Sequence, residues 1–154
     1  MRAVGSTAFF GAVSGFLCVA VGAFWEPLIQ DQAVRNLVDT AARYHIMHTM
    51  AAFASVSFRN WGSERARLAP AFFFAGILVY CGSTYLKALG APIPIMGFAP
   101  LGGFLFLTGW GLMAWAGLEL FSQSLRGARS DGEPVLASSA NRPLETAADR
   151  SRPG

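Results

Sequence analysis

The only two histidines of the chain fall within one polar-aromatic run, Tyr44-His45-Ile46-Met47-His48. The two rings are three residues apart, a spacing that brings side chains to neighbouring positions on one helix face. Two imidazoles so placed can bind one metal ion, pass protons or hold a small ligand. The chemistry open to this run is therefore that of the imidazole ring.

A metal or haem site would need more than this pair. A closed zinc site takes four ligands, and the sequence offers no compelling third and fourth. Haem bound between two helices would need a histidine on each helix, and both histidines of this chain lie in one segment. We therefore predict no metal and no cofactor. We also predict no catalytic residue and no enzyme activity, because no Ser-His-Asp arrangement, no paired carboxylates within an apolar segment and no phosphate loop is visible.

Three interpretations of His45 and His48 stay open. They can hydrogen-bond to neighbouring helices and fix the packing, they can form a polar site for proton relay or a small ligand, or they can ligate a metal or haem. An ionisable side chain at membrane depth usually faces protein or a water-filled cavity. The candidate site comprises Tyr44, His45, His48, Pro100, Gly102 and Gly103.

The elements that must position these residues are membrane helices. Ala3–Phe24, Leu68–Leu86 and Ile95–Leu118 contain no charged residue, and about 20 apolar residues cross a bilayer. The charge-free length of the first segment favours a retained helix over a signal peptide, whose apolar part is about 7–15 residues. A fourth segment, Tyr44–Phe58, is short and spans only if its helix continues outward through Val34. We predict an all-α membrane protein, a bundle of four transmembrane helices spanning approximately residues 3–24, 41–59, 68–87 and 97–118.

The second helix has two contrasting faces. At 100° per residue, His45 and His48 continue an apolar stripe that should face the bundle. Asp39 and Arg43 lie on the opposite side, four residues apart and able to form an ion pair. The histidines are therefore predicted to face other helices.

Small residues predict close packing of the first helix. Gly11, Ser14, Gly15, Cys18 and Gly22 follow one another at spacings of three and four, and small residues let membrane helices approach closely. We predict that Gly11, Gly15 and Gly22 form a packing seam within the molecule. Homodimerisation through the same stripe is the rival interpretation.

The uncharged segment from Ala88 to Leu101 separates the last two spans. Its prolines exclude one continuous helix, because each lacks an N–H group and restricts the preceding residue. We predict that the last helix starts at about Pro100. The segment is either an ordinary connection or a re-entrant element that closes over Tyr44, His45 and His48.

Charge distribution predicts the orientation. The net charge of +3 would suggest an acidic partner in a soluble protein, but these basic residues flank apolar spans, so we predict no nucleic-acid partner. Six arginines flank one side and three basic residues the other, and the richer side should be cytoplasmic. The two sets are Arg2, Arg59, Arg65, Arg67, Arg126 and Arg129 against Arg35, Arg43 and Lys87. Both termini are therefore predicted to be cytoplasmic.

The composition changes after the last span. Residues 121–154 carry scattered Ser, Ala, Pro and charged residues and few large apolar ones, too little apolar surface to offset the entropy of ordering. We predict one transmembrane domain over residues 1–120, a short helical extension through about Leu125, and a disordered cytoplasmic tail over 121–154.

These motifs resemble the domain-of-unknown-function 423 family of small four-helix membrane proteins. The resemblance covers roughly Ala3 to Leu120 and implies the four-helix fold and a location in a bacterial inner membrane, with no established activity. It rests on Gly22-Ala23-Phe24, Thr40 to His48, Gly82-Ser83-Thr84-Tyr85, and Pro100 to Gly103 continuing to Gly109-Trp110. The family continues its first motif with Gly-Ala-His-Gly, whereas this chain has Trp25-Glu26-Pro27-Leu28. The loop histidine of the family is therefore absent from this chain. A metal or proton role of a histidine cluster would have to be met with Glu26 in its place or with no substitute.

Two functions follow as hypotheses. The leading one is a non-enzymatic accessory or structural membrane component that contacts the lipid bilayer and other membrane proteins or a second copy of itself. The alternative is a small transporter or proton-linked permeation element in which Tyr44, His45 and His48 line a polar cavity.

Overall fold

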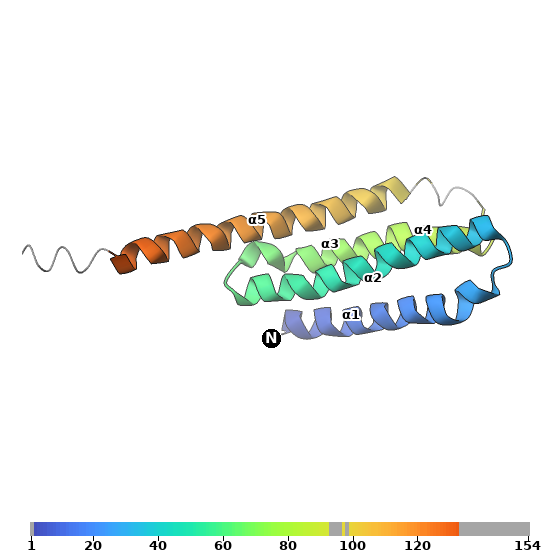
Figure 1. Ribbon diagram of the computed structural model, residues 1–154, viewed down its shortest axis with the longest axis horizontal. Coiled ribbons are helices and arrows are strands. Elements are labelled where there is room, and N and C mark those ends of the chain that lie inside the picture. The colour runs from blue at the N-terminus through green and yellow to red at the C-terminus, as the bar shows by residue number, and fades with distance from the viewer. Residues whose placement is uncertain (1, 93–96, 98, 133–154) are drawn as a thin grey trace, which may run out of the picture. The chain divides into compact units, whose positions relative to one another are not determined.

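The computed structural model describes residues 2–92, 97 and 99–132, with side chains over 4–92, 97 and 99–128. The described residues are helical apart from short turns, and no strand occurs among them, so the predicted all-α class is confirmed. Four helical rods follow one another along the chain (Figure 1). They are α1 (Arg2–Ala20) with η1 (Val21–Trp25) and η2 (Glu26–Leu28), α2 (Gln32–Asn60), η3 (Glu64–Arg67) with α3 (Ala69–Gly76), η4 (Ile77–Cys81) and α4 (Gly82–Ala88), and α5 (Ala99–Gly132).

Helix α2 begins well before the two histidines. The Asp31 carboxylate caps it by accepting hydrogen bonds from the backbone N–H groups of Ala33 at 2.7 Å and Val34 at 3.3 Å. The helix ends at Asn60, and Gly62 then adopts a φ of 106°, a backbone conformation that glycine adopts readily. The expected outward continuation through Val34 is therefore confirmed. At 29 residues, the helix is roughly 44 Å long, enough to cross a bilayer.

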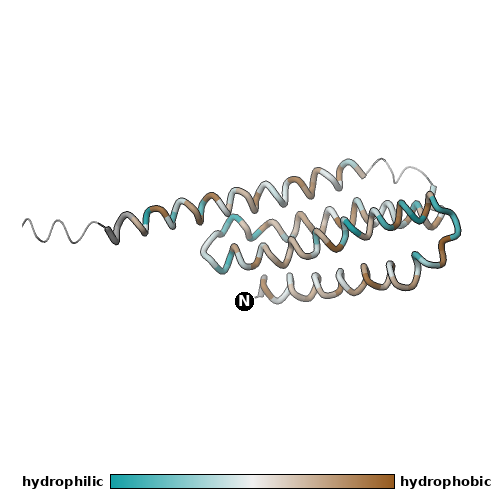
Figure 2. The backbone as a smooth tube through the Cα atoms, in the orientation of Figure 1, coloured by the Kyte–Doolittle hydropathy of each residue, from teal (hydrophilic) through white to brown (hydrophobic). Residues whose placement is uncertain are grey.

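Three of the four rods have the length and composition of a membrane span. They are Val4–Leu28, Glu64–Ala88 and Ala99–Ala128. Figure 2 shows why α2 differs, since hydrophilic residues colour its first turns while the rods beside it are mostly apolar. That α2 also crosses the membrane stays a prediction.

Helix α2 lies at the centre of the bundle, with α1 along one side and the rod formed by α3, η4 and α4 along another (Figure 1). A buried cluster joins small residues of α2 to aromatic and aliphatic side chains of the third rod and α5. It contains Ala41, Ala51, Ala52, Ala69, Phe73, Ile77, Cys81, Phe106 and Met113. The alanines of α2 let the surrounding helices approach its backbone closely.

Helix α5 packs on the third rod through a seam of alternating small and large residues. Every member of this seam is buried, and the spacing of four and three residues keeps the members on one face. The members are Gly102, Phe106, Gly109, Met113 and Ala116. A Cβ built on Gly109 would meet the Phe73 ring at 2.6 Å, and one built on Gly76 would meet the Phe106 ring at 2.5 Å. Each helix thus inserts a phenylalanine over a glycine of the other.

The chain divides into two units, Met1–Leu120 and Phe121–Gly154. Helix α5 begins at Ala99, one residue before the expected start, and runs to Gly132. Residues 121–132 are therefore helical where a short extension to about Leu125 followed by a tail was expected. Residues 133–154, to which the rest of the predicted tail belongs, lie outside the described part of the chain.

Candidate functional site

The two histidines face different neighbours. His45 contacts α1 and α4, whereas His48 contacts α3 and α5. The expectation that they join Tyr44 in one polar site therefore does not describe the structure. Each ring has its own environment.

His45 belongs to a directed chain of buried hydrogen bonds. Thr49 donates its hydroxyl proton to the His45 carbonyl at 2.9 Å, so the Ser14 hydroxyl donates to Thr49 Oγ1 at 2.8 Å. The Ser14 oxygen then accepts from His45 Nε2–H at 2.9 Å. This leaves His45 Nδ1 to accept from the Tyr85 hydroxyl at 3.3 Å. Because the Thr49 and Ser14 hydroxyl protons are already donated elsewhere, the neutral His45 ring carries its proton on Nε2.

This chain ties three helices together, because Ser14 lies on α1, His45 and Thr49 on α2, and Tyr85 on α4. Every hydroxyl and imidazole proton in it has an acceptor. Its last acceptor is a backbone carbonyl of α2, which cannot pass a proton on. The geometry accordingly fits a packing role for His45 better than a relay.

His48 makes a different set of contacts. Its Nδ1–H donates to the Tyr44 carbonyl at 2.7 Å, which in the neutral ring leaves Nε2 as a bare acceptor. No described residue donates a hydrogen bond to this Nε2 atom. The ring is 3% exposed and stacks on Phe106 with 3.5 Å between centroids and 12° between planes. Tyr44 stacks on it at 5.8 Å.

A groove of about 560 Å³ passes over His48 between α2 and α5. Apart from the imidazole, its lining is dominated by aromatic and aliphatic side chains, and most of these are exposed on the outer surface. The lining residues are Tyr44, Met47, His48, Pro100, Gly103, Phe104, Phe106, Leu107 and Trp110. His48 forms the buried base of an apolar groove that opens outward.

The groove extends from the Pro100 end of α5 into the apolar segments. The two aromatic rings packed against His48 are Phe73, in the segment Glu64–Ala88, and Phe106, in Ala99–Ala128. Both lie at least seven residues from the ends of their segments, which is roughly 10 Å along a helix. The free acceptor of His48 therefore lies among residues of two candidate membrane spans.

Four of the six expected site residues line this groove, namely Tyr44, His48, Pro100 and Gly103, whereas His45 and Gly102 face elsewhere. Pro100 and Gly103 line the His48 groove, but Gly102 faces the third rod, where a Cβ would lie 2.6 Å from the backbone nitrogen of Tyr80. Sequence reasoning placed Gly102 in a polar site, yet it is a packing residue. It missed Phe106 and Trp110 as groove residues, although their spacing of four marked one helix face.

The glycines of α1 behave unequally. A Cβ on Gly11 would lie 2.4 Å from the Phe53 ring of α2, so this glycine allows close packing. A Cβ on Gly15 or Gly22 would meet nothing within 4 Å. The face of α1 that is buried consists of Thr7, Gly11, Ser14 and Cys18. Only Gly11 of the three predicted packing glycines makes a close approach.

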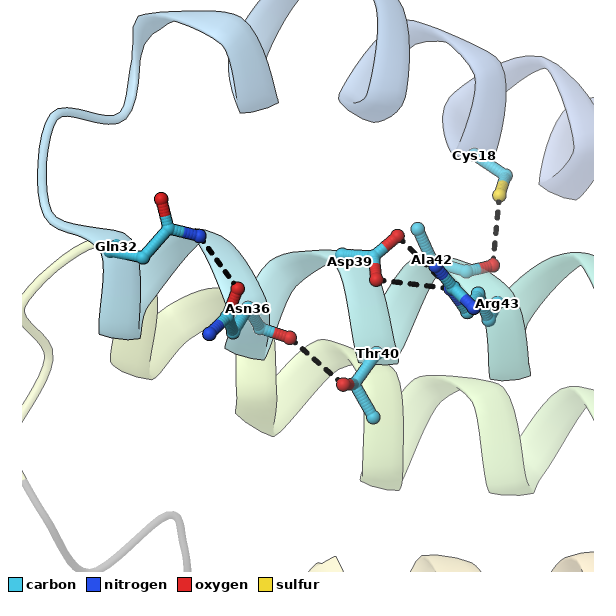
Figure 3. Close-up of polar contacts among 7 residues, drawn as sticks. All are labelled: Cys18, Gln32, Asn36, Asp39, Thr40, Ala42 and Arg43. Atoms are coloured by element: carbon cyan, nitrogen blue, oxygen red, sulfur yellow. Dashed lines mark hydrogen bonds and ion pairs between the residues drawn. The ribbon is translucent and has the colours of Figure 1, made fainter.

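The exposed face of α2 carries the polar residues of its first turns (Figure 3). The expected Asp39–Arg43 ion pair is confirmed, with Nε and Oδ2 3.0 Å apart. Gln32 donates to the Asn36 side chain at 2.8 Å, and Cys18 of α1 donates to the Ala42 carbonyl at 3.3 Å. Over the described residues, no three His, Cys, Asp or Glu side chains are grouped so that they could hold a metal ion.

Comparison with known proteins gives a family and several relatives. The profile of a family described as protein of unknown function (DUF423) matches residues 18–103. A UPF0382 membrane protein of Haemophilus influenzae is 35% identical over 112 residues, covering 70% of this chain and 90% of the relative. The UPF0382 inner membrane protein YgdD of Escherichia coli is 32% identical, with 72% and 88% covered. The UPF0382 membrane protein YwdK of Bacillus subtilis is 30% identical, with 71% and 93% covered. No solved structure gives a significant match.

Proposed function

The chain belongs to the DUF423 family of membrane proteins, and from this premise we propose that it is a non-enzymatic accessory component of the bacterial inner membrane that binds a lipid-soluble ligand. The ligand class we infer is a long-chain amphiphile that carries a hydroxyl group. It would occupy the groove over His48.

The observation that carries this proposal is the free acceptor of His48 within an apolar groove. A polar atom without a partner is costly at hydrocarbon depth, and a hydroxyl group entering the groove would remove that cost. The ring cannot turn to find another partner easily, because Nδ1–H is held by the Tyr44 carbonyl and Phe106 covers one face. The acceptor is thus held in place before a ligand arrives.

The lining supports binding rather than chemistry. Ligand sites are mostly apolar with a few placed polar groups, as this groove is. General acid–base or nucleophilic catalysis would need a second reactive group within reach of His48. Apart from the His48 imidazole, the polar side-chain groups of the described lining are the Tyr44 hydroxyl and the Trp110 indole N–H.

The rival function, proton-linked permeation, would require Tyr44, His45 and His48 to line one polar cavity. His45 instead borders a second groove with Ser14 and Tyr85, on another side of α2. Its hydrogen bonds close on a backbone carbonyl. We therefore favour the binding role.

A photoactivatable long-chain alcohol tests this role. In proteoliposomes, we expect the alcohol to label Met47, Leu107 or Trp110, which line the groove. His48→Phe keeps an aromatic ring against Phe106 but removes the acceptor, so labelling should fall about fivefold to tenfold, the value of one hydrogen bond. Mass spectrometry of the labelled peptides provides the measurement.

Two controls make the experiment specific. The methyl ether of the same probe cannot donate a hydrogen bond, so it should label the parent only as weakly as the alcohol labels His48→Phe. Phe16→Ala alters an exposed side chain of α1 outside the groove and should leave labelling unchanged. Equal labelling by alcohol and ether would contradict the proposed acceptor role.

We also propose that both termini are cytoplasmic, on the charge asymmetry of the flanking arginines. Arg59 and Arg67 border one small pocket with Thr7 near the start of α1, which supports grouping these arginines at one end of the bundle. A reporter active only outside the cytoplasm should be silent when fused to Gly154 and active when inserted near Gln30. The reverse pattern would refute this orientation.

A further inference from the structure

The part of the chain that the structure describes leaves one face of α2 uncovered along the length of the helix. Its exposed residues recur at alternating spacings of four and three, the heptad spacing with which one helix packs along another. This stripe consists of Asn36, Thr40, Arg43, Met47, Met50, Ala54 and Ser57. We call it the α2 stripe.

The first half of the α2 stripe is polar. The Asn36 side chain accepts a hydrogen bond from Gln32, and Arg43 donates one to Asp39. Gln32 and Asp39 lie beside the stripe. The side chains of Arg43 and Asp39 remain 77% and 41% exposed. Figure 3 shows this row of polar contacts along one helix. The groups satisfy some of one another's hydrogen bonds, but they present charge and amides outward.

This polar half lies beside apolar surface. The Cys18 thiol of α1 donates a hydrogen bond to the Ala42 carbonyl of α2. Cys18 therefore lies at the same depth as the turn of α2 that contains Arg43. Beyond Cys18, toward the end of α1 and into η1, Val19 is 63% exposed and Phe24 is 75% exposed. On the other flank Tyr44 contacts Tyr80, with 5.1 Å between ring centroids, and beyond it α4 exposes Leu86 by 47%.

Exposed apolar side chains flank the Asp39–Arg43 pair on both neighbouring helices, and the exposed Lys87, next to Leu86, marks the end of this apolar surface. An Asp–Arg pair that faces lipid beside these side chains would be costly, because charged residues in membrane helices usually face protein or water. The polar half of the α2 stripe therefore needs a cover that the described residues of the chain do not supply.

We propose that this cover is the α2 stripe of a second copy, related by a two-fold axis along the membrane normal. The stripe is self-complementary, because Asp39 and Arg43 carry opposite charges one helical turn apart and the side-chain amide of Asn36 both donates and accepts. A two-fold pair brings like residues to the same depth, so Arg43 of each copy can reach Asp39 of the other. An Asn within a heptad seam also favours a defined register.

The second half of the stripe fits the same partner. Met47, Met50, Ala54 and Ser57 present small or flexible side chains, which allow two helices to approach closely. The dimer goes beyond ligand binding, and Met47 is the one stripe residue that also borders the His48 groove. His48 faces away from the stripe, toward α3 and α5.

Disulfide cross-linking in native membranes tests the dimer. Thr40→Cys and Met50→Cys place thiols on the stripe, and Phe16→Cys places one on the exposed face of α1, which is 73% exposed at this residue. The parent, with buried Cys18 and Cys81, gives the baseline. With two differently tagged copies expressed together, the stripe variants should give a cross-linked species carrying both tags, about tenfold above Phe16→Cys, as expected for a contact held by interhelical hydrogen bonds.

A charge exchange identifies the contact. Adding Arg43→Glu to Thr40→Cys places two acidic residues together and should reduce cross-linking to the Phe16→Cys level. Adding both Asp39→Arg and Arg43→Glu restores opposite charges and should recover it. His48→Phe should leave cross-linking unchanged, so failure of the ligand proposal and failure of the dimer can be told apart.

Three results would overturn the dimer. These are cross-linking no greater than for Phe16→Cys, a product containing one tag and a different membrane protein, and cross-linking that is indifferent to Arg43→Glu.

Discussion

Replacing Gly102 by alanine is expected to destabilise the bundle more than any other single methyl group added to α5. A Cβ there would lie 2.6 Å from both the backbone nitrogen and the Cβ of Tyr80. The obstacle is backbone in the middle of a helix, which cannot rotate away as a side chain can. Overpacking typically costs about 1–3 kcal/mol and occasionally more, and we expect the upper part of that range. The measurement is the free energy of unfolding in detergent, or the melting temperature.

Gly103→Ala is the matched control for Gly102→Ala. It adds the same methyl group one residue later in the same helix, where a Cβ would meet nothing within 4 Å. Alanine is also about 1 kcal/mol better than glycine within a helix, so the control should be neutral or slightly stabilising. If the two variants unfold alike, α5 does not approach the third rod as closely as the structure places it.

Replacing His45 by phenylalanine is expected to cost about 2 kcal/mol. The change removes the acceptor of the Tyr85 hydroxyl and the donor to Ser14, and an unsatisfied buried polar group costs about 1–3 kcal/mol. Combining it with Ser14→Ala should recover part of the loss. Coupling energies between hydrogen-bonding pairs in membrane proteins reach about 0.6–1.7 kcal/mol. A double-mutant cycle on the free energy of unfolding measures this term.

The comparison variant is His48→Phe. It removes only a bond within α2 and retains a ring that can stack on Phe106, so its effect on unfolding should be small. Its effect on ligand labelling should be large, because the change removes the acceptor that the ligand's hydroxyl group would use. If His48→Phe destabilised the protein as much as His45→Phe, the assignment of packing to one histidine and binding to the other would be wrong.

The arrangement of residues along the sequence was sufficient to predict the helices. Charge-free runs located three segments of spanning length, Asp39 and Arg43 formed the ion pair expected from their spacing, and Pro100 marked the start of α5 to within one residue. These features are local. A run of apolar residues must leave water, and a spacing of four residues brings two side chains together on any helix, whatever surrounds it.

The glycine stripe of α1 shows where such local rules end. Gly11 and Gly15 are one turn apart on the same helix, yet only Gly11 meets another residue, the Phe53 ring of α2. The contact depends on where the partner helix carries a large side chain. Likewise, Gly102 and Gly103 looked equivalent in sequence, and only the position of Tyr80 separates a packing residue from a groove residue.

The histidines show the same division most clearly. Their sequence spacing determined that His45 and His48 lie about 60° apart around α2, and their residue type determined that each can donate and accept one hydrogen bond when neutral. Only the tertiary structure decided that the two rings face different neighbours, because α2 is packed among three other helices. One ring is thereby enclosed by hydroxyl groups of α1 and α4, and the other by aromatic rings of α3 and α5 with its acceptor free. The physical reason is that a helix fixes the direction of a side chain, while the neighbouring helices supply its partners.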